Sequence, residues 1–344
     1  MRKPLVRIIL FLVGAELAYL VLANLALNLP LTQSLINGHR PEKYAVYWDR
    51  AWSWYPFRVH ARGVSINGQT LSLQWQADLS AASASLSVLP LSRRTVQVRG
   101  VDAQDIGFRL RPRPKPGKDY ETIRSFFPPI RDRDAASPAE VRERPRRGGG
   151  WRIVVDEIRA GGSHEFWVFQ VRGALDGLLR ANLAYETRGG PFSLSGGEAD
   201  IELRSLILNK DWEVSSGGTV EGRFAFAPFV PSENRGAKVL GFLSFEGDLG
   251  ASVDSLEFLN FYLRDFNGMQ VDGRGQVSGH LAYERGDLVS GTDLAVSAAE
   301  LGLTALPYQV KGDGGIGISV EPDDPTTLRM GIRFGALEAL HLED

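Results

Sequence analysis

The sequence predicts a mainly β protein, with an N-terminal transmembrane helix followed by a long, curled, mostly antiparallel sheet that carries a Pro- and Arg-rich insertion. Residues 5–29 are almost entirely apolar, most of the chain after Pro56 alternates apolar and polar residues, and residues 111–150 interrupt that alternation. The 344 residues therefore divide into an anchor (1–30), an aromatic segment (31–57), a first β part (58–110), a linker or insertion (111–150) and a second β part (151–344).

The apolar stretch is long enough to cross a membrane as a helix. Residues 8–29 number 22, and about 20 are needed to span the hydrocarbon core. Glu16 is the only charge within it, and Arg2, Lys3 and Arg7 precede it, which favours a cytoplasmic N-terminus. A cleaved signal peptide is the alternative, with Val21-Leu22-Ala23 as the best cleavage site. Because apolar residues continue after that site, an uncleaved single-pass anchor is favoured.

Residues 44–57, YAVYWDRAWSWYPF, hold seven aromatic residues in fourteen. Trp and Tyr prefer the membrane–water interface, where the ring is shielded and the polar tip meets water. The spacing of these aromatic residues equally allows a local hydrophobic core at the start of the soluble domain. The sequence therefore leaves open whether they lie at the membrane interface or in such a core. The membrane-interface candidates are Tyr44, Tyr47, Trp48, Trp52, Trp54 and Tyr55.

The period-two alternation predicts some eighteen to twenty strands, each with one apolar and one polar face. Glycine pairs such as Gly189-Gly190, Gly196-Gly197 and Gly314-Gly315 are expected to join many of them as turns. The apolar face can be hidden in a sandwich, a closed barrel or an open groove. The polar outer faces argue against an outer-membrane barrel. A sandwich of this size would divide into repeated units of about 100 residues, and no such repeat is visible, which favours one long curled sheet.

Residues 111–150 contain seven prolines, and eleven Lys or Arg against six acids. This composition predicts a solvated linker or long insertion, and its positive charge also suits an arm that touches anionic lipid headgroups. Ser125-Phe126-Phe127 is an apolar island that could fix the segment to the domain. Further along, residues 254–266 are the best helix candidate, or alternatively two pieces of strand.

The chain resembles the AsmA-like envelope proteins. The resemblance rests on the N-terminal span, on SWYPFRVHARGVSI, on ASASLSVLPLSRRTVQVRGVDAQDIGFRLR with its corner at Pro90-Leu91, and on later segments such as WRIVVDEIRAGG and VDGRGQVSGHLAYERGDLVSG. It covers most of the chain after residue 52. It implies an inner-membrane anchor, a periplasmic β-groove lined by apolar side chains, and a role in moving phospholipid or maintaining the outer membrane. The chain is short for that family.

An apolar trough would lower the cost of carrying acyl chains through water, by about 0.8 kcal/mol per buried CH₂. Twenty strands spaced about 4.8 Å apart would give a trough on the order of 90 Å long. The same residues could instead form a dry sandwich core. The groove candidates from the alternation are Leu71, Leu73, Trp75, Leu86, Val88, Val96, Val98, Ile106, Phe108 and Leu110 in the first half, and Ile201, Leu203, Phe224, Phe226, Val277, Leu281, Tyr283, Ile316, Ile318 and Val320 in the second.

The sequence shows no motif for catalysis, for a metal or for a cofactor. It has no cysteine, its five histidines lack metal-ligand spacing, and it contains neither a phosphate-binding loop nor a nucleophile elbow. A net charge of −2 argues against nucleic acid as a partner. We therefore expect no enzyme, and membrane phospholipids as partners. The alternative function is a membrane-anchored scaffold that holds envelope proteins at exposed sheet edges.

Overall fold

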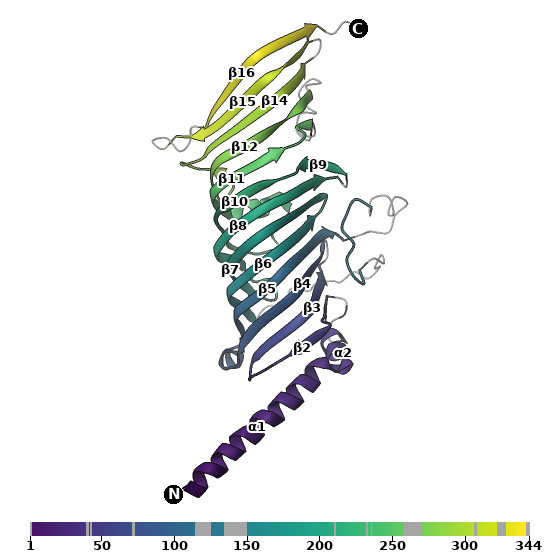
Figure 1. Ribbon diagram of the computed structural model, residues 1–344, viewed down its shortest axis with the longest axis vertical. Helices are drawn as coiled ribbons and strands as arrows, with labels where there is room; N and C mark the ends of the chain where they lie inside the picture. The colour runs from purple at the N-terminus through teal and green to yellow at the C-terminus, as the bar shows by residue number, and fades with distance from the viewer. Residues whose placement is uncertain are drawn as a thin grey trace. The chain divides into compact units, whose positions relative to one another are not determined.

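The protein consists of an N-terminal apolar helix followed by a large, curled, mostly antiparallel sheet (Figure 1). The fold class predicted from the sequence is thus confirmed. The computed structural model describes residues 2–38, 41, 43–70, 73–113, 125–133, 150–209, 211–231, 233–234, 236–257, 260, 270–305, 308–321 and 328–341.

The helices and strands follow one another along the chain with few interruptions. They are α1 (Arg2–Asn28), α2 (Pro30–Gly38), β1 (Tyr44–Tyr47), β2 (Arg50–Trp52), β3 (Arg58–Gln69), β4 (Leu73–Ser87), the 3₁₀ helix η1 (Leu89–Arg93), β5 (Thr95–Pro112), β6 (Arg152–Val168), β7 (Val171–Glu186), β8 (Phe192–Leu208), β9 (Trp212–Ser215), β10 (Gly218–Phe229), η2 (Gly236–Phe242), β11 (Leu243–Val253), β12 (Gln270–Glu284), β13 (Asp287–Leu288), β14 (Asp293–Ala305), β15 (Tyr308–Val320) and β16 (Leu328–His341).

The strand order follows the sequence order closely. The main path is β1-β3-β4-β5-β6-β7-β8-β10-β11-β12-β14-β15-β16, and β2, β9 and β13 pair beside it. The pair β5–β6 is parallel, so the chain has to cross back along the sheet between these two strands. The segment that was predicted to be a linker or insertion makes this crossing.

The contacts divide the chain into two compact units. Unit 1 comprises residues 1–169 and 182–190, and unit 2 comprises residues 170–181 and 191–344, so β7 contributes to both. Unit 1 contains α1, α2 and β1 to β6, whereas unit 2 contains β8 to β16. The predicted division at residues 111–150 therefore falls within unit 1.

Two of the glycine pairs lie inside long strands, although the sequence pattern predicted turns there, whereas Gly189-Gly190 lies in the turn between β7 and β8 as predicted. Gly196 and Gly197 belong to β8, and Gly196 has φ 58°. Gly314 and Gly315 belong to β15, where the register with β16 shifts just before Gly314. Gly196 lies in a bulge of β8, which bends the strand without ending it, whereas the extra residue beside Gly314 is on β16. The described strands are consequently longer and fewer, at sixteen, than the alternation alone predicted.

Asparagine side chains cover the first edge of the sheet. The amide of Asn24 donates to Ser53 O at 2.9 Å and accepts from Ser53 N at 2.9 Å. Asn28 pairs in the same way with Ala51, and Asn37 with Val46. Asn24 and Asn28 are four residues apart in the helix, which is a rise of about 6 Å, and their partners Ser53 and Ala51 are two residues apart, which is about 6.6 Å of strand. The two distances match, so both pairs can form at once. Each amide thus replaces one residue of a missing neighbouring strand.

Replacing Asn24 with Ala is expected to lower the free energy of unfolding by about 1–3 kcal/mol, because Ser53 is buried and its backbone groups would lose their partners. Denaturant unfolding of the full chain in detergent, followed by Trp fluorescence, measures the effect. Leu25→Ala, one residue along and exposed, is the control. Equal stability of the two variants would contradict this role for Asn24.

Unit 2 uses the same device near its small hydrophobic core. That core comprises Leu256, Val271 and Ala298. Asn260 donates to Val271 O at 2.9 Å and accepts from Val271 N at 2.7 Å, beyond the point where β11 ends. Most of the helix candidate at residues 254–266 lies outside the described residues.

Candidate functional site

One face of unit 2 carries apolar rows that run across the strands. Residues directly opposite each other in an antiparallel pair share a face of the sheet. Ile201 lies opposite Val220, and Val220 lies opposite Leu249. The next row consists of the positions of Leu203, Gly218, Ala251, Val277, Val296 and Ile316. The predicted alternation therefore brings residues far apart in sequence onto one apolar surface.

The opposite face of the same strands is polar and charged. Asp200 lies opposite Glu221, Glu221 opposite Asp248, and Asp248 opposite His280. The Nδ1 atom of His280 is 2.9 Å from Asp248 Oδ1. The sheet of unit 2 is thus amphipathic. Its charged face is suited to contact with water, and its opposite face is suited to contact with apolar groups.

An aromatic row lies within the apolar face, and its residues help to line a hollow of about 670 Å³ whose wall also includes the charged residues Glu198, Arg223, Glu246 and Glu284. Phe224, Phe245 and Tyr283 lie directly opposite one another on β10, β11 and β12. On β8 the matching position is Gly197, where a Cβ atom would meet the Phe224 carbonyl oxygen at 2.3 Å. Phe245 was not among the sequence candidates, although the alternation of residues 241–249 placed it on a strand. Its register with Phe224, visible only in the structure, identifies it.

The exposure of the candidates shows that this face is open. Ile201, Leu203, Phe224 and Phe226 are half-buried, as are Val277, Leu281, Tyr283 and Ile318. Of the candidates whose side chains are described, only Val320 is fully buried, at 4% exposed. A dry core between two packed sheets would bury residues of this kind almost completely. The described residues therefore show a single sheet whose apolar face has no second layer over it.

Unit 1 has an apolar face of its own on β4 and β5. Trp75 lies opposite Leu110, and the pairs on either side place Leu73, Phe108 and Ile106 on the same face. All are half-buried except Phe108, which is 37% exposed. Leu86 and Val98 form another opposed pair nearer the start of β5, beside Val96, and Val88 lies just after β4. Leu71 and the side chain of Ile316 lie outside the described residues.

No protein-family model and no curated protein matches this chain. Membership of the AsmA-like family therefore stays a prediction.

The aromatic segment divides into an engaged part and an exposed part. The indole N–H of Trp48 donates to Leu27 O at 2.9 Å, and Trp52 stacks on His60 with ring centroids 5.6 Å apart. Tyr44 and Tyr47 on β1 are half-buried. Trp54 and Tyr55, by contrast, are 65% and 49% exposed. Only the last two of the six candidates thus present their rings freely.

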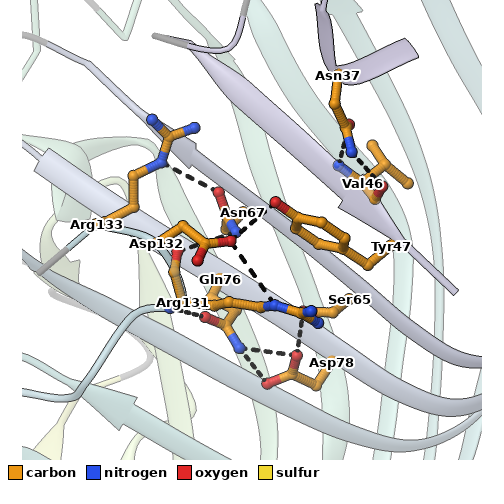
Figure 2. A network of polar contacts seen from close by, with 10 residues as sticks. All are labelled: Asn37, Val46, Tyr47, Ser65, Asn67, Gln76, Asp78, Arg131, Asp132 and Arg133. Carbon is orange, nitrogen blue, oxygen red and sulfur yellow. Dashed lines mark hydrogen bonds and ion pairs between the residues drawn. The ribbon is translucent and has the colours of Figure 1, made fainter. Parts of the chain in front are cut away.

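The crossing segment is held on the polar face of unit 1, as Figure 2 shows. Gln76 accepts from Arg131 N at 2.7 Å, and Asn67 donates to Arg131 O at 3.2 Å. Asn67 also accepts from Arg133 Nε at 3.1 Å, while Asp78 accepts from Gln76 Nε2 at 2.8 Å. Side-chain amides of β3 and β4 thereby bind the backbone of the segment.

The predicted pinning residues are only partly correct. Phe126 is 37% exposed, whereas Pro128 and Ile130 are fully buried, so the packed residues lie just after the predicted Ser125-Phe126-Phe127 island. Arg111 and Arg133 are buried as well. Residues 128–133 thus alternate between buried positions (Pro128, Ile130, Arg133) and exposed ones (Pro129, Arg131, Asp132), and residues 114–124 and 134–149 lie outside the described residues.

Tyr47 joins this segment to the first edge strand. Its hydroxyl donates to Asp132 Oδ2 at 2.8 Å, and the Arg131 guanidinium lies 4.0 Å from its ring centroid. Burial, followed by the hydrogen bond to Asp132, raises the pKa of Tyr47. Tyr47 therefore works as a structural contact of the segment.

His60, His164 and His280 also have structural partners. His164 Nδ1 accepts from Ile106 N at 3.1 Å in a buried position, and His60 stacks on Trp52. Among the described residues, no group of three His, Asp or Glu side chains is placed to hold a metal ion. The apolar face is accordingly the main candidate site.

Asp105 provides a pH-dependent contact where the register between β5 and β6 shifts, and its φ is 51°. Hydrogen bonds from Ser80 Oγ at 2.7 Å and from Ser163 N at 2.9 Å lower the pKa of this carboxyl group, and His164 adds to the effect. A lowered pKa in the folded state stabilises the protein above the ordinary pKa, and the gain is lost as the pH falls through the lowered value. Asp105→Asn is thus expected to show a smaller loss of stability on acidification.

Urea unfolding between neutral and acid pH measures this difference. Asp287→Asn, which changes an exposed carboxylate on β13, is the control and should follow the parent protein. The role assigned to Asp105 would fail if its variant kept the full acid dependence.

Proposed function

We propose that this protein is a membrane-anchored lipid-binding protein, whose open apolar sheet face holds the acyl chains of phospholipids. The observation that carries the proposal is the set of half-exposed apolar rows that cross the strands of unit 2, including the row of Phe224, Phe245 and Tyr283. Unit 1 offers a second such surface at Trp75 and Leu110.

The energetics favour acyl chains as the ligand. Each CH₂ transferred from water to an apolar surface gains about 0.8 kcal/mol. The rows run across the strands, so a chain lying along a row meets a new apolar side chain about every 4.8 Å. Such binding needs no catalytic group and no cofactor.

The anchor supports the same function. Residues 6–28 of α1 are long and apolar enough to cross a membrane, and their mean hydropathy is 2.2 over the best window. With Arg2, Lys3 and Arg7 on the cytoplasmic side, the sheet would lie in the periplasm of a cell with two membranes. We infer from this arrangement an AsmA-like, inner-membrane protein that binds or conveys phospholipid and supports the outer membrane.

Lipid extraction tests the proposal directly. Full-length protein purified from bacterial membranes in mild detergent is expected to retain phospholipid that mass spectrometry detects, in excess of an anchor-only fragment of residues 1–38. Equal lipid on the two samples would contradict binding by the sheet.

A second candidate function, a scaffold for partner proteins, rests on β16. This strand pairs only with β15 within the described chain, whereas asparagine side chains cover the first edge of the sheet. An open edge can accept a strand from a partner. Gly331→Pro, which removes a backbone donor from β16, is expected to reduce crosslinking to envelope proteins and leave bound lipid unchanged.

A further inference from the structure

Two neighbouring turns of unit 1 form an exposed apolar tip. We call Trp54, Tyr55, Phe57 and Leu89 the aromatic tip; they are 65%, 49%, 57% and 89% exposed. The turns adjoin, because Leu86 N donates to Phe57 O at 2.8 Å. Large side chains so exposed on adjacent turns mark a contact surface.

The backbone of the tip is satisfied from within. Ser53, which is buried, places its Oγ 2.9 Å from Tyr55 O and 2.7 Å from Arg58 O. In the second turn, Leu89 O accepts from Ser92 Oγ at 2.8 Å. A turn can enter a lipid environment only when its polar backbone groups have partners, and these turns meet that condition at the carbonyls named.

Contacts with α1 set the level of the tip along the apolar helix. The hydroxyl of Tyr19 is 2.7 Å from Ser53 Oγ and donates to Tyr55 O at 3.4 Å. From Val6 to Tyr19 the helix rises about 20 Å, at about 1.5 Å per residue, whereas the hydrocarbon core is about 30 Å thick. If α1 crosses the bilayer from Val6, Tyr55 lies beside the part of the helix that is still within the membrane.

We propose that the aromatic tip inserts into the leaflet nearest the sheet, in the same bilayer that α1 crosses. This inference rests on the proposed anchoring by α1. Trp and Tyr are suited to the headgroup region, while Phe57 and Leu89 reach the acyl chains. Arg93, exposed at the end of η1, is placed to meet lipid phosphates. A bilayer fits better than a protein partner, because the tip is continuous with the lipid-facing helix.

Site-directed spin labelling tests the insertion cleanly, because the chain has no native cysteine. Trp54→Cys and Leu89→Cys are labelled in full-length protein reconstituted into phosphatidylethanolamine–phosphatidylglycerol vesicles. Collision with oxygen reports the membrane, and collision with a water-soluble nickel chelate reports water. Phe169→Cys is the matched control, because this exposed aromatic lies in the same unit beside Leu110, at the other end of β5. Leu12→Cys, at an exposed position of α1, is the reference for the interior of the bilayer.

The label at 89 is expected to resemble the label at 12, and the label at 54, in the headgroup region, is expected to fall between 12 and 169. At both 54 and 89, nickel collisions should be several-fold below those at 169. If they match 169 while 12 stays shielded, the anchor stands and the insertion is refuted. If the label at 12 also collides freely with the nickel chelate, α1 does not cross the bilayer, and both the proposed anchor and the proposed insertion are refuted. Phospholipid retained by the sheet is measured on the same samples. Retained lipid shows that lipid binding by the sheet is intact even when the insertion or the anchor is refuted.

Discussion

Val220→Asp is expected to reduce the phospholipid retained by the protein by about tenfold or more. Val220 lies between Ile201 and Leu249 in an apolar row of unit 2. A carboxylate against an acyl chain loses hydration without gaining a partner, which costs several kcal/mol, and about 1.4 kcal/mol already corresponds to a tenfold change in affinity. Quantitative mass spectrometry of extracted lipid, per mole of purified protein, measures the loss.

Thr219→Asp is the matched control. Thr219 is the preceding residue of β10, it is exposed, and its partners are Glu202 and Gly250 on the polar side of the sheet. The same charge there should leave bound lipid unchanged. Circular dichroism confirms that both variants stay folded. Equal lipid in both folded variants would show that the apolar face is not where lipid binds.

Arg111→Ala is expected to lower the free energy of unfolding by at least about 3 kcal/mol. The buried guanidinium donates to Gln74 Oε1 at 3.0 Å, to Pro128 O at 3.0 Å and to Arg133 O at 2.8 Å. Hydrogen bonds from a charged donor contribute about 1.5–3 kcal/mol each, and their loss leaves buried acceptors without partners. Denaturant unfolding and limited proteolysis near residue 128 measure the loss of stability and the release of the crossing segment.

Two further variants sharpen this test. Arg111→Lys should recover little, because one ammonium group cannot reproduce the planar, forked set of donors. Arg99→Ala, on the same strand with its side chain 62% exposed, should change stability by less than about 1 kcal/mol. If Arg111→Ala and Arg99→Ala unfolded alike, the segment would be held mainly by Ile130 and Pro128.

The sequence predicted the architecture because its two signals are local. The run of apolar residues predicts α1, and the period of two predicts strands and the face that each residue occupies. A glycine in the sequence does not show by itself whether the chain turns or continues. A residue with φ near 58°, such as Gly196, occurs in bulges within a strand as well as in turns between strands. Only pairing with the next strand distinguishes them, and pairing is not local.

The sequence predicted only part of the candidate site. Alternation placed Phe224 and Tyr283 on the apolar face, but Phe245 joins them through the register of three strands. The asparagine pairs at Ser53 and Ala51 were also missed, since an amide within an apolar helix carries no sign of its partner. The buried Arg111 was counted with the solvated charges, because composition does not show that a returning segment covers it.

The asparagine pairs also bear on how the sheet is made. Along the main path each strand pairs with the path strand before it, and the edge nearest α1 is closed by side chains from α1 and α2. New strands can then be added at one end only, in the order in which they are synthesised. Between neighbours of this kind the stretch of chain to be closed is short, except before β6, which must wait for about forty residues to cross. Assembly of the sheet would therefore proceed from the edge nearest α1 toward β16, with one pause before β6.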